Sequence, residues 1–179
     1  KRTGPFGFST TSFGRCEVVV FSPDHMGNLG SMPVARIETV IKAWQSRTSH
    51  LQKLEGVIQV FPFENRGQDI GVTLHHPHGQ IYSYPFVTPR TEKLIASVRN
   101  HGGDFFGELV EFDKSSSRNI LETENFVSFV PFAARWPIEI HLLPKRQVAD
   151  CTELTAAEVS ELDGAEKQIL LGHEAVYDQ

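Results

Sequence analysis

The stretch "TLHHPHGQIYSYPF" (73–86) places three of the chain's eight histidines directly before an alternating apolar run. Alternation of this kind is typical of a β-strand, which we predict over residues 80–86. Pro77 separates His76 from His78, and Gly79 and Gln80 follow. The sequence therefore predicts a cluster of imidazoles where this strand begins.

The segments on either side of this stretch predict a mixture of strands and helices. A β-branched run at 14–23 indicates a buried strand, and further strands are expected at 56–65, 119–132 and 138–144. A loop is expected at 24–32 and a turn at 66–71. Helices are expected from Pro33, with an end between Ser46 and Leu54, then at 91–99 and 104–112, and after the capping box of Thr155 and Glu158. The order predicts an α+β fold, with a mostly antiparallel sheet and helices on one side.

Two segments share one plan, which suggests an internal repeat. Residues 20–44 and 142–166 each run from a strand through a proline and a loop into an amphipathic helix. We therefore predict a first repeat over 1–112, which carries the histidine cluster, and the start of a second, incomplete repeat over 113–179. On this interpretation the chain is expected to be clipped at both ends.

Composition excludes several classes of function. The chain has 179 residues and is 40% hydrophobic, which is enough for a core. The formal charge of −5 gives no general attraction for nucleic acid. No apolar run approaches the roughly 20 residues of a membrane span, and the first residues lack the apolar region of a secretory signal. Cys16 and Cys151 fit no metal or redox spacing, so we expect two free thiols in a reducing compartment.

The histidine cluster has three interpretations. Adjacent histidines at a strand end can be ordinary polar residues with satisfied hydrogen bonds. His76 and His78 are two positions apart, so in an extended segment they share a face and could ligate one metal ion, with His25 as the best distant partner. A zinc site needs four ligands, or three and an open position, and no nearby cysteine pair completes such a set.

Nucleophilic catalysis is the third interpretation. A neutral imidazole attacks phosphorus well when one ring nitrogen is free and the other donates its hydrogen to a fixed acceptor. Gly79 would let a phosphate approach the main chain. Gln80 can donate an amide hydrogen to a phosphoryl oxygen but cannot activate water, because it does not titrate. The cluster is therefore suited to holding a covalent phospho-histidine until a second substrate arrives.

The segment "FENRGQDIGVTLHHPHGQ" (63–80) resembles the active site of galactose-1-phosphate uridylyltransferases, within the histidine-triad superfamily. "VVVFSPDH" (18–25) and "VPFAARWPIEIHLLPK" (130–145) resemble two further segments of that family. The resemblance implies a fold of histidine-triad-like repeats. It also implies that UMP moves from UDP-glucose to galactose 1-phosphate through a covalent uridylyl-histidine, in a cytoplasmic enzyme that forms a homodimer. Charge and composition, as above, predict neither a nucleic-acid nor a membrane partner.

The resemblance also implies a role for each matching residue. His78 would be the nucleophile and Gln80 would hold the transferred phosphoryl group, so these two are the candidate catalytic residues. The candidate substrate-binding residues are Phe63, Asn65, Thr73 and Gly79. His25 and His76 would be two ligands of a structural zinc ion. The chain departs from the family in having Leu74-His75 where an Asn-Pro pair is usual, and in lacking the cysteine pair that usually completes the zinc site.

Three other functions are compatible with the same residues. A phosphorylase of the superfamily would use His78 to transfer an adenylyl group. A non-catalytic nucleotide- or zinc-binding fragment needs only part of the site. A histidine-triad hydrolase is disfavoured, because Gln80 stands where hydrolases carry their third histidine.

Overall fold

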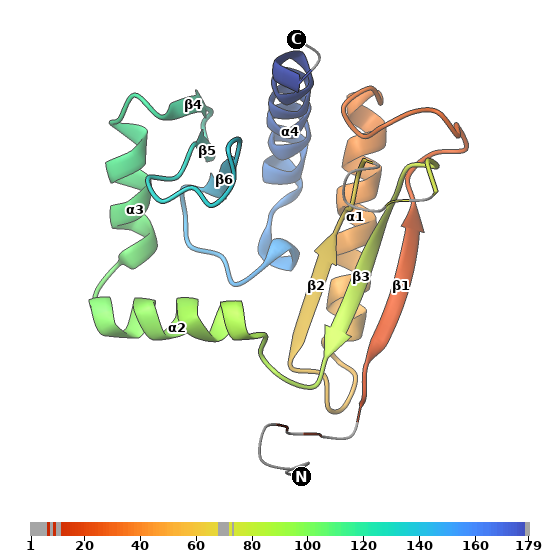
Figure 1. The fold of residues 1–179 in the computed structure, drawn as a ribbon, viewed down its shortest axis with the longest axis horizontal. Coiled ribbons are helices and arrows are strands. Elements are labelled where there is room, and N and C mark those ends of the chain that lie inside the picture. The colour runs from red at the N-terminus through yellow and green to blue at the C-terminus, as the bar shows by residue number, and fades with distance from the viewer. Residues whose placement is uncertain (1–6, 8, 10–11, 68–71, 73, 178–179) are drawn as a thin grey trace.

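Two three-stranded antiparallel sheets and a set of α-helices form the part of the chain that the computed structural model describes, namely residues 7, 9, 12–67, 72 and 74–177 (Figure 1). The first sheet has the order β1 (Arg15–Val20), β3 (His78–Tyr84), β2 (Gln59–Phe63), and the second has β4 (Asn119–Glu122), β5 (Phe126–Phe129), β6 (His141–Pro144). The α+β class and the antiparallel pairing are confirmed. The segment predicted as one strand at 119–132 instead contains β4 and β5, joined by a short connection at 123–125.

The helices begin and end close to the predicted positions. They are α1 (Val34–Leu51), α2 (Pro89–His101), α3 (Phe105–Lys114) and α4 (Ala156–Tyr177), with a short 3-10 turn at Cys151–Glu153. Pro33 caps α1, where its missing N–H costs nothing. The predicted end of α1 between Ser46 and Leu54 is confirmed, since the helix ends at Leu51, and the buried Thr48 and Leu51 hold its last turn in place.

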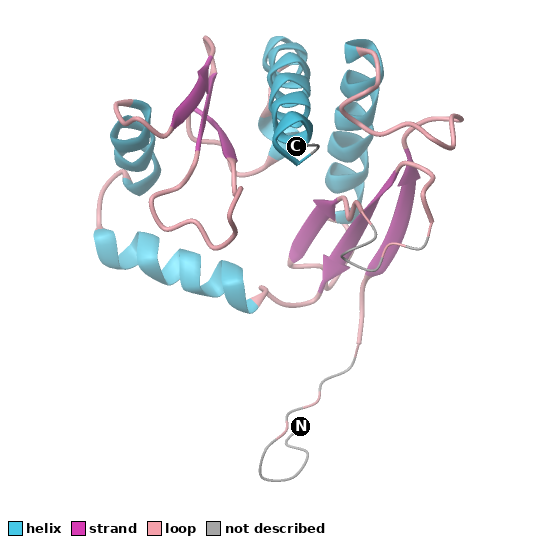
Figure 2. Ribbon diagram, turned by 45° about the horizontal axis from the view of Figure 1, so that its top comes forward, coloured by secondary structure: helices cyan, strands magenta, loops and turns pink. Residues whose placement is uncertain are grey.

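The main core lies between the first sheet, α1 and α4. Figure 2 shows α1 against one face of this sheet and α4 beside α1. Ile37, Val40 and Ile41 form the buried stripe of α1, and Val159 of α4 joins the same cluster. Phe21, directly after β1, meets the Trp44 ring edge-on at 5.8 Å between centroids. The core therefore fixes the carboxyl end of β1 against α1.

The central strand β3 sorts its side chains onto two faces. Gly79, Ile81 and Ser83 are buried on the face that α1 covers, whereas the intervening residues are half-buried on the opposite, open face. This alternation follows from the two-residue period of a strand. The residues on the open face of β3 are His78, Gln80, Tyr82 and Tyr84.

The prediction that 14–23 is a buried strand is wrong for half of its side chains. Strand β1 is an edge strand, and Val18 and Val20 remain 62% and 59% exposed. Each stands directly opposite an open-face residue of β3, because Val18 pairs with Gln80 and Val20 pairs with His78. Only the other face of β1, which carries Val19, packs against the core.

The second sheet lies between α3 and α4 in both views (Figures 1 and 2). Val110 of α3 packs on Val127 and Phe129 of β5. On the α4 side, the main-chain and side-chain amides of Asn125 donate to Glu161, at 2.7 and 2.6 Å. Helix α4 therefore connects the second sheet to the core around α1.

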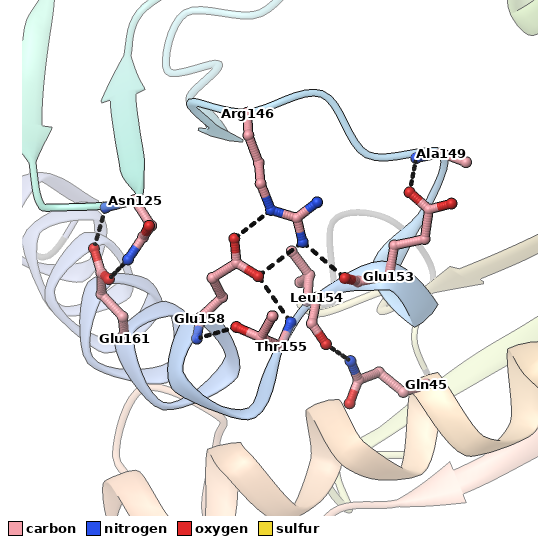
Figure 3. Close-up of polar contacts among 9 residues, drawn as sticks. All are labelled: Gln45, Asn125, Arg146, Ala149, Glu153, Leu154, Thr155, Glu158 and Glu161. Carbon is pink, nitrogen blue, oxygen red and sulfur yellow. Dashed lines mark hydrogen bonds and ion pairs between the residues drawn. The ribbon is translucent and has the colours of Figure 1, made fainter.

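Helix α4 begins with the predicted capping box, which is confirmed (Figure 3). The Thr155 hydroxyl accepts from the Glu158 amide at 3.2 Å, and the Glu158 carboxylate accepts from the Thr155 amide at 2.8 Å. Arg146 adds a two-pronged ion pair to Glu158 at 2.5 and 2.8 Å. Chiefly because of this arginine, the pKa of Glu158 falls to about 2.

The two segments of the predicted repeat have the same order of elements. A strand, a loop and a helix run from β1 to α1 and again from β6 to α4, and the two helices lie side by side (Figure 1). The predicted boundary between residues 112 and 113 falls inside α3, and the division into repeats stays a prediction. Both cysteines are free thiols, as expected. No helix among the described residues combines the length and the hydropathy needed to cross a bilayer.

Replacing Glu158 by Gln is expected to lower the free energy of unfolding at neutral pH and to flatten its fall in acid. A lowered pKa stabilises the fold above pH 4.5, and this stabilisation is lost as the pH falls toward 2. Urea unfolding of both proteins between pH 2 and 7 measures the difference. Glu111→Gln removes an exposed charge from α3 and serves as the control, with little effect expected. Equal acid sensitivity of Glu158→Gln and the wild type would contradict this assignment.

Candidate active site

A cavity of about 230 Å³ opens where β3 begins. Its lining comes from the loop at 26–28, the segment after β2 at 64–67, and the histidine stretch at 74–78. These segments converge because β1 and β2 are both antiparallel to β3, so β1 ends beside His78 and β2 ends beside Gln80, both at the start of β3. The sheet topology therefore assembles one site from three distant parts of the sequence.

The hydrogen bond of His78 decides which ring nitrogen is free. Its Nδ1 lies 2.7 Å from the main-chain carbonyl oxygen of His76. A carbonyl oxygen only accepts, so Nδ1 carries the hydrogen and the neutral ring has its lone pair on Nε2. No described residue hydrogen-bonds to Nε2. This arrangement, with one nitrogen held and the other available, is what a nucleophilic imidazole requires.

The backbone around His78 is held by packing. The Phe21 amide donates to the Pro77 carbonyl at 2.9 Å, which joins the end of β1 to the histidine stretch. A Cβ on Gly79 would lie 2.8 Å from the Phe21 ring and 3.1 Å from the Phe63 carbonyl oxygen. Gly79 is therefore explained by close packing on the buried face of β3, and its expected contact with substrate stays a prediction.

His25 and His76 lie in direct contact. Their Nδ1 atoms are 2.9 Å apart, and His76 Nε2 bonds the Ser22 carbonyl oxygen at 2.7 Å. Because Nε2 of His76 is the donor to that carbonyl, its Nδ1 keeps a lone pair that faces His25. Two nitrogens on a tetrahedral zinc, each bonded at ~2.0–2.1 Å, are separated by roughly 3.3 Å, so a small shift would admit an ion. The pair fits two of four ligands, and no cluster of three or more His, Cys, Asp or Glu residues occurs among the residues that the structure describes.

The other predicted site residues divide between the cavity and the open face of the sheet. Asn65 lines the cavity together with His76 and His78. Phe63 and Gln80 stand opposite each other in the β2–β3 ladder, beside the cavity on the open face. The Gln80 side-chain oxygen accepts a hydrogen bond from the Tyr82 hydroxyl at 3.0 Å. Thr73 and most of the predicted turn at 66–71 lie outside the described residues.

Sequence reasoning missed an acidic residue inside the recognised motif. Glu64, between Phe63 and Asn65, lines the cavity. Burial raises the pKa of Glu64, and the nearby Arg66 and His78 act in the opposite direction. The position of Glu64 next to Asn65 could have identified it as a site residue, because residues that directly follow a strand often line the binding site at that strand's end.

A second acid interacts electrostatically with Glu64. Burial raises the pKa of Glu166 on α4 to about 7, with further contributions from the charges of Glu64 and Asp163. Asp163 is 1% exposed, and neither of its carboxylate oxygens has a hydrogen-bond partner among the described residues.

Comparison with protein families matches residues 7–88 to the amino-terminal domain of galactose-1-phosphate uridyl transferase. A galactose-1-phosphate uridylyltransferase of Streptomyces lividans is 42% identical over 93% of this chain and 48% of its own length. The enzyme of that name from Thermotoga maritima is 38% identical over 100% of this chain and 57% of its own length. The chain therefore spans about half the length of these relatives.

Solved structures agree with these matches. A uridylyltransferase structure superposes with a TM-score of 0.80 and 37% identity over 86% of this chain and 51% of that one. An ADP-glucose phosphorylase from Arabidopsis thaliana, with bound ADP-glucose, superposes with a TM-score of 0.81 and 27% identity. The match covers 88% of this chain and 50% of the phosphorylase chain. The fold predicted from the histidine motif is thus found in both kinds of protein.

Replacing Glu166 by Gln is expected to stabilise the protein above pH 7. The raised pKa means that folding buries a charge once Glu166 ionises, so this residue lowers stability progressively as the pH rises from 4.5 through 7. The gain at pH 8 should be on the order of 1–3 kcal/mol, and it should vanish below pH 4.5. Urea unfolding across this range measures it.

The matched control on the same helix is Glu161→Gln. Both carboxylate oxygens of Glu161 accept hydrogen bonds from Asn125, so this change should destabilise the protein at pH 8. A loss of stability in Glu166→Gln at pH 8 would show that the Glu166 carboxylate is satisfied in the fold.

Proposed function

We propose a function from the premise that the chain belongs to the galactose-1-phosphate uridylyltransferase family: it transfers UMP from UDP-glucose to galactose 1-phosphate through a uridylyl group on His78. The family matches support this reaction class, and one observation carries the assignment of the nucleophile. That observation is the bond from His78 Nδ1 to the His76 carbonyl oxygen, which leaves Nε2 unprotonated.

The proposed reaction proceeds by two displacements at one phosphorus. In the first, the Nε2 lone pair attacks the α-phosphorus of UDP-glucose. The bond from that phosphorus to the bridging oxygen breaks, and glucose 1-phosphate leaves with the electron pair. In the second, a phosphate oxygen of galactose 1-phosphate attacks the same phosphorus, and the electrons of the N–P bond return to Nε2. Nδ1 keeps its hydrogen throughout, so no net proton is transferred.

The residues next to His78 suit this sequence of events. The Gln80 amide would donate to a phosphoryl oxygen, where negative charge is held during transfer. Because an amide does not titrate, it cannot remove a proton from water, and the adduct should persist until an acceptor arrives. We assign Asn65 and Phe63 to nucleotide contacts because they border the same cavity and sheet face. Thr73 and Gly79 keep the substrate-binding roles implied by the family.

We also propose that His25 and His76 hold a structural zinc ion. Their Nδ1 atoms, 2.9 Å apart, need only a small separation to share a metal, and the ion would connect the 24–32 loop to the histidine stretch. The remaining ligands would come from outside the described residues. The homodimer and the cytoplasmic location stay predictions.

A second candidate function is transfer of an adenylyl group by the same histidine. The structural match to an ADP-glucose phosphorylase supports it, at lower identity than the uridylyltransferase match. Here His78 would attack the α-phosphorus of ADP-glucose, and inorganic phosphate would replace galactose 1-phosphate as acceptor. The two candidates therefore differ in the base and in the acceptor, and not in the nucleophile.

Incubation with UDP-glucose alone is expected to release at most one glucose 1-phosphate per chain and to leave UMP on His78. Intact mass and peptide mapping without acid detect the adduct, since a phosphoramidate is labile in acid. ADP-glucose at the same concentration is the matched comparison, and should give no adduct. His78→Ala should abolish the adduct, whereas Gln80→His should increase hydrolysis, because a titrating ring would lie beside the phosphorus.

Several results would contradict these assignments. A uridylyl group on His75 or His76 would overturn the choice of nucleophile. An adduct with ADP-glucose alone would favour the adenylyl transferase. No adduct with either nucleotide would favour a binding module.

The zinc proposal is tested by metal content. Purified protein is expected to retain up to one zinc ion per chain, and His25→Ala or His76→Ala should weaken binding at least about tenfold. Elemental analysis and chelator competition measure this, with the exposed His50→Ala as control. Unchanged zinc affinity in both ligand variants would disprove the proposed pair.

A further inference from the structure

We propose that Tyr82 is a positioning residue for the transfer reaction, because its hydroxyl holds the Gln80 side chain with the amide nitrogen turned toward the phosphoryl group. This inference rests on the proposed function. It assigns a role to a residue outside the histidine motif, two positions farther along the same strand.

The geometry begins with the two-residue period of β3. Gln80 and Tyr82 are neighbours on the open face, and the Tyr82 hydroxyl lies 3.0 Å from Gln80 Oε1. An amide oxygen only accepts, so the hydroxyl is the donor in this bond. Gln80 Nε2 then keeps both of its hydrogens for other acceptors.

The orientation of the amide matters because its two ends are chemically opposite. Phosphoryl oxygens only accept hydrogen bonds, so they attract Nε2–H and repel Oε1. An unanchored glutamine can rotate its amide and present either end. Anchoring Oε1 on the Tyr82 hydroxyl removes the wrong orientation before substrate arrives, which is the advantage of a preorganised donor.

The Tyr82 hydroxyl is itself held in place. The Phe63 ring meets the Tyr82 ring edge-on, at 5.0 Å between centroids and 88° between planes. Cys16 stands opposite Tyr82 in the β1–β3 ladder, and its side chain is the main cause that raises the pKa of the phenol. Tyr82 therefore keeps the proton that it donates to Gln80.

Packing alone does not account for this hydroxyl. Tyr82 is half-buried on the open face, where phenylalanine would satisfy the ring contact with Phe63 equally well. Tyr84 is two residues farther along the same face, and its hydroxyl makes no hydrogen bond to Gln80. Tyr84→Phe is therefore a matched control for Tyr82→Phe, since each removes one hydroxyl from the same surface.

The first test measures adduct formation from UDP-glucose in a single turnover. Tyr82→Phe should slow this step about three- to tenfold, the value of one neutral hydrogen bond, and change the dissociation constant for UDP-glucose less than about twofold. Tyr84→Phe should react at the wild-type rate. In a Gln80→Leu background, Tyr82→Phe should have no further effect, because the amide that it orients is gone. A wild-type rate in Tyr82→Phe, or an undiminished effect in the Gln80→Leu background, would overturn the proposal.

The second test does not depend on activity. The side-chain amide signals of Gln80, assigned in ¹H–¹⁵N spectra by their loss in Gln80→Leu, should shift or broaden in Tyr82→Phe and stay unchanged in Tyr84→Phe. Unchanged Gln80 signals in Tyr82→Phe would disprove the anchoring. Absence of an adduct in the wild type, with these spectral changes present, would instead reject the proposed function and leave the anchored amide established.

Discussion

The register of β3 between its two neighbours is the constraint on which the rest of the structure depends. Both ladders place Ile81 toward α1 and Gln80 toward the open face. Shifting a strand by one residue exchanges its faces, so a slip of β3 would bury Gln80 and expose Ile81, which is now fully buried. The apolar core under the sheet therefore also determines which side chains can reach a substrate. Stability and the chemistry of the site come from the same alternation.

The tautomer of His78 follows from the main chain rather than from an ionisable partner. In many sites a carboxylate orients the imidazole, and that control is lost when the carboxylate is protonated. Here the acceptor is the His76 carbonyl oxygen, which does not titrate. The position of the His76 carbonyl is set by the following residue, Pro77. The Pro77 carbonyl in turn accepts a hydrogen bond from the amide of Phe21, which lies in the core. The proton on Nδ1 is thus fixed by backbone packing and does not depend on a titrating partner.

Sequence patterns predicted what local chemistry determines, and failed where distant packing decides. The histidine cluster, the capping box at Thr155 and the stripe of α1 all follow from residue order within a few positions. The exposure of Val18 could not be predicted in this way, because local residue order does not show that β1 is an edge strand. The approach of Glu166 to Glu64 likewise requires knowing that α4 packs beside α1. The two-residue period of a strand predicts that Gln80 and Tyr82 are neighbours on one face. It does not predict which atom of the Gln80 amide accepts the hydrogen bond from the Tyr82 hydroxyl.

Burial and neighbouring groups limit the negative charge at the wall of the cavity, although the protein is acidic. The chain carries a formal charge of −5, and Glu64 lies at the wall of the cavity. A full negative charge there would repel a nucleotide phosphate. Burial opposes that charge by raising the pKa of Glu64, and the interaction with the half-buried Glu166 adds a further penalty for ionising both acids together. Arg66 offsets part of the remaining charge on Glu64. The negative charge beside His78 is thereby reduced, which suits the phosphate that the proposed reaction would bring to His78 and Gln80.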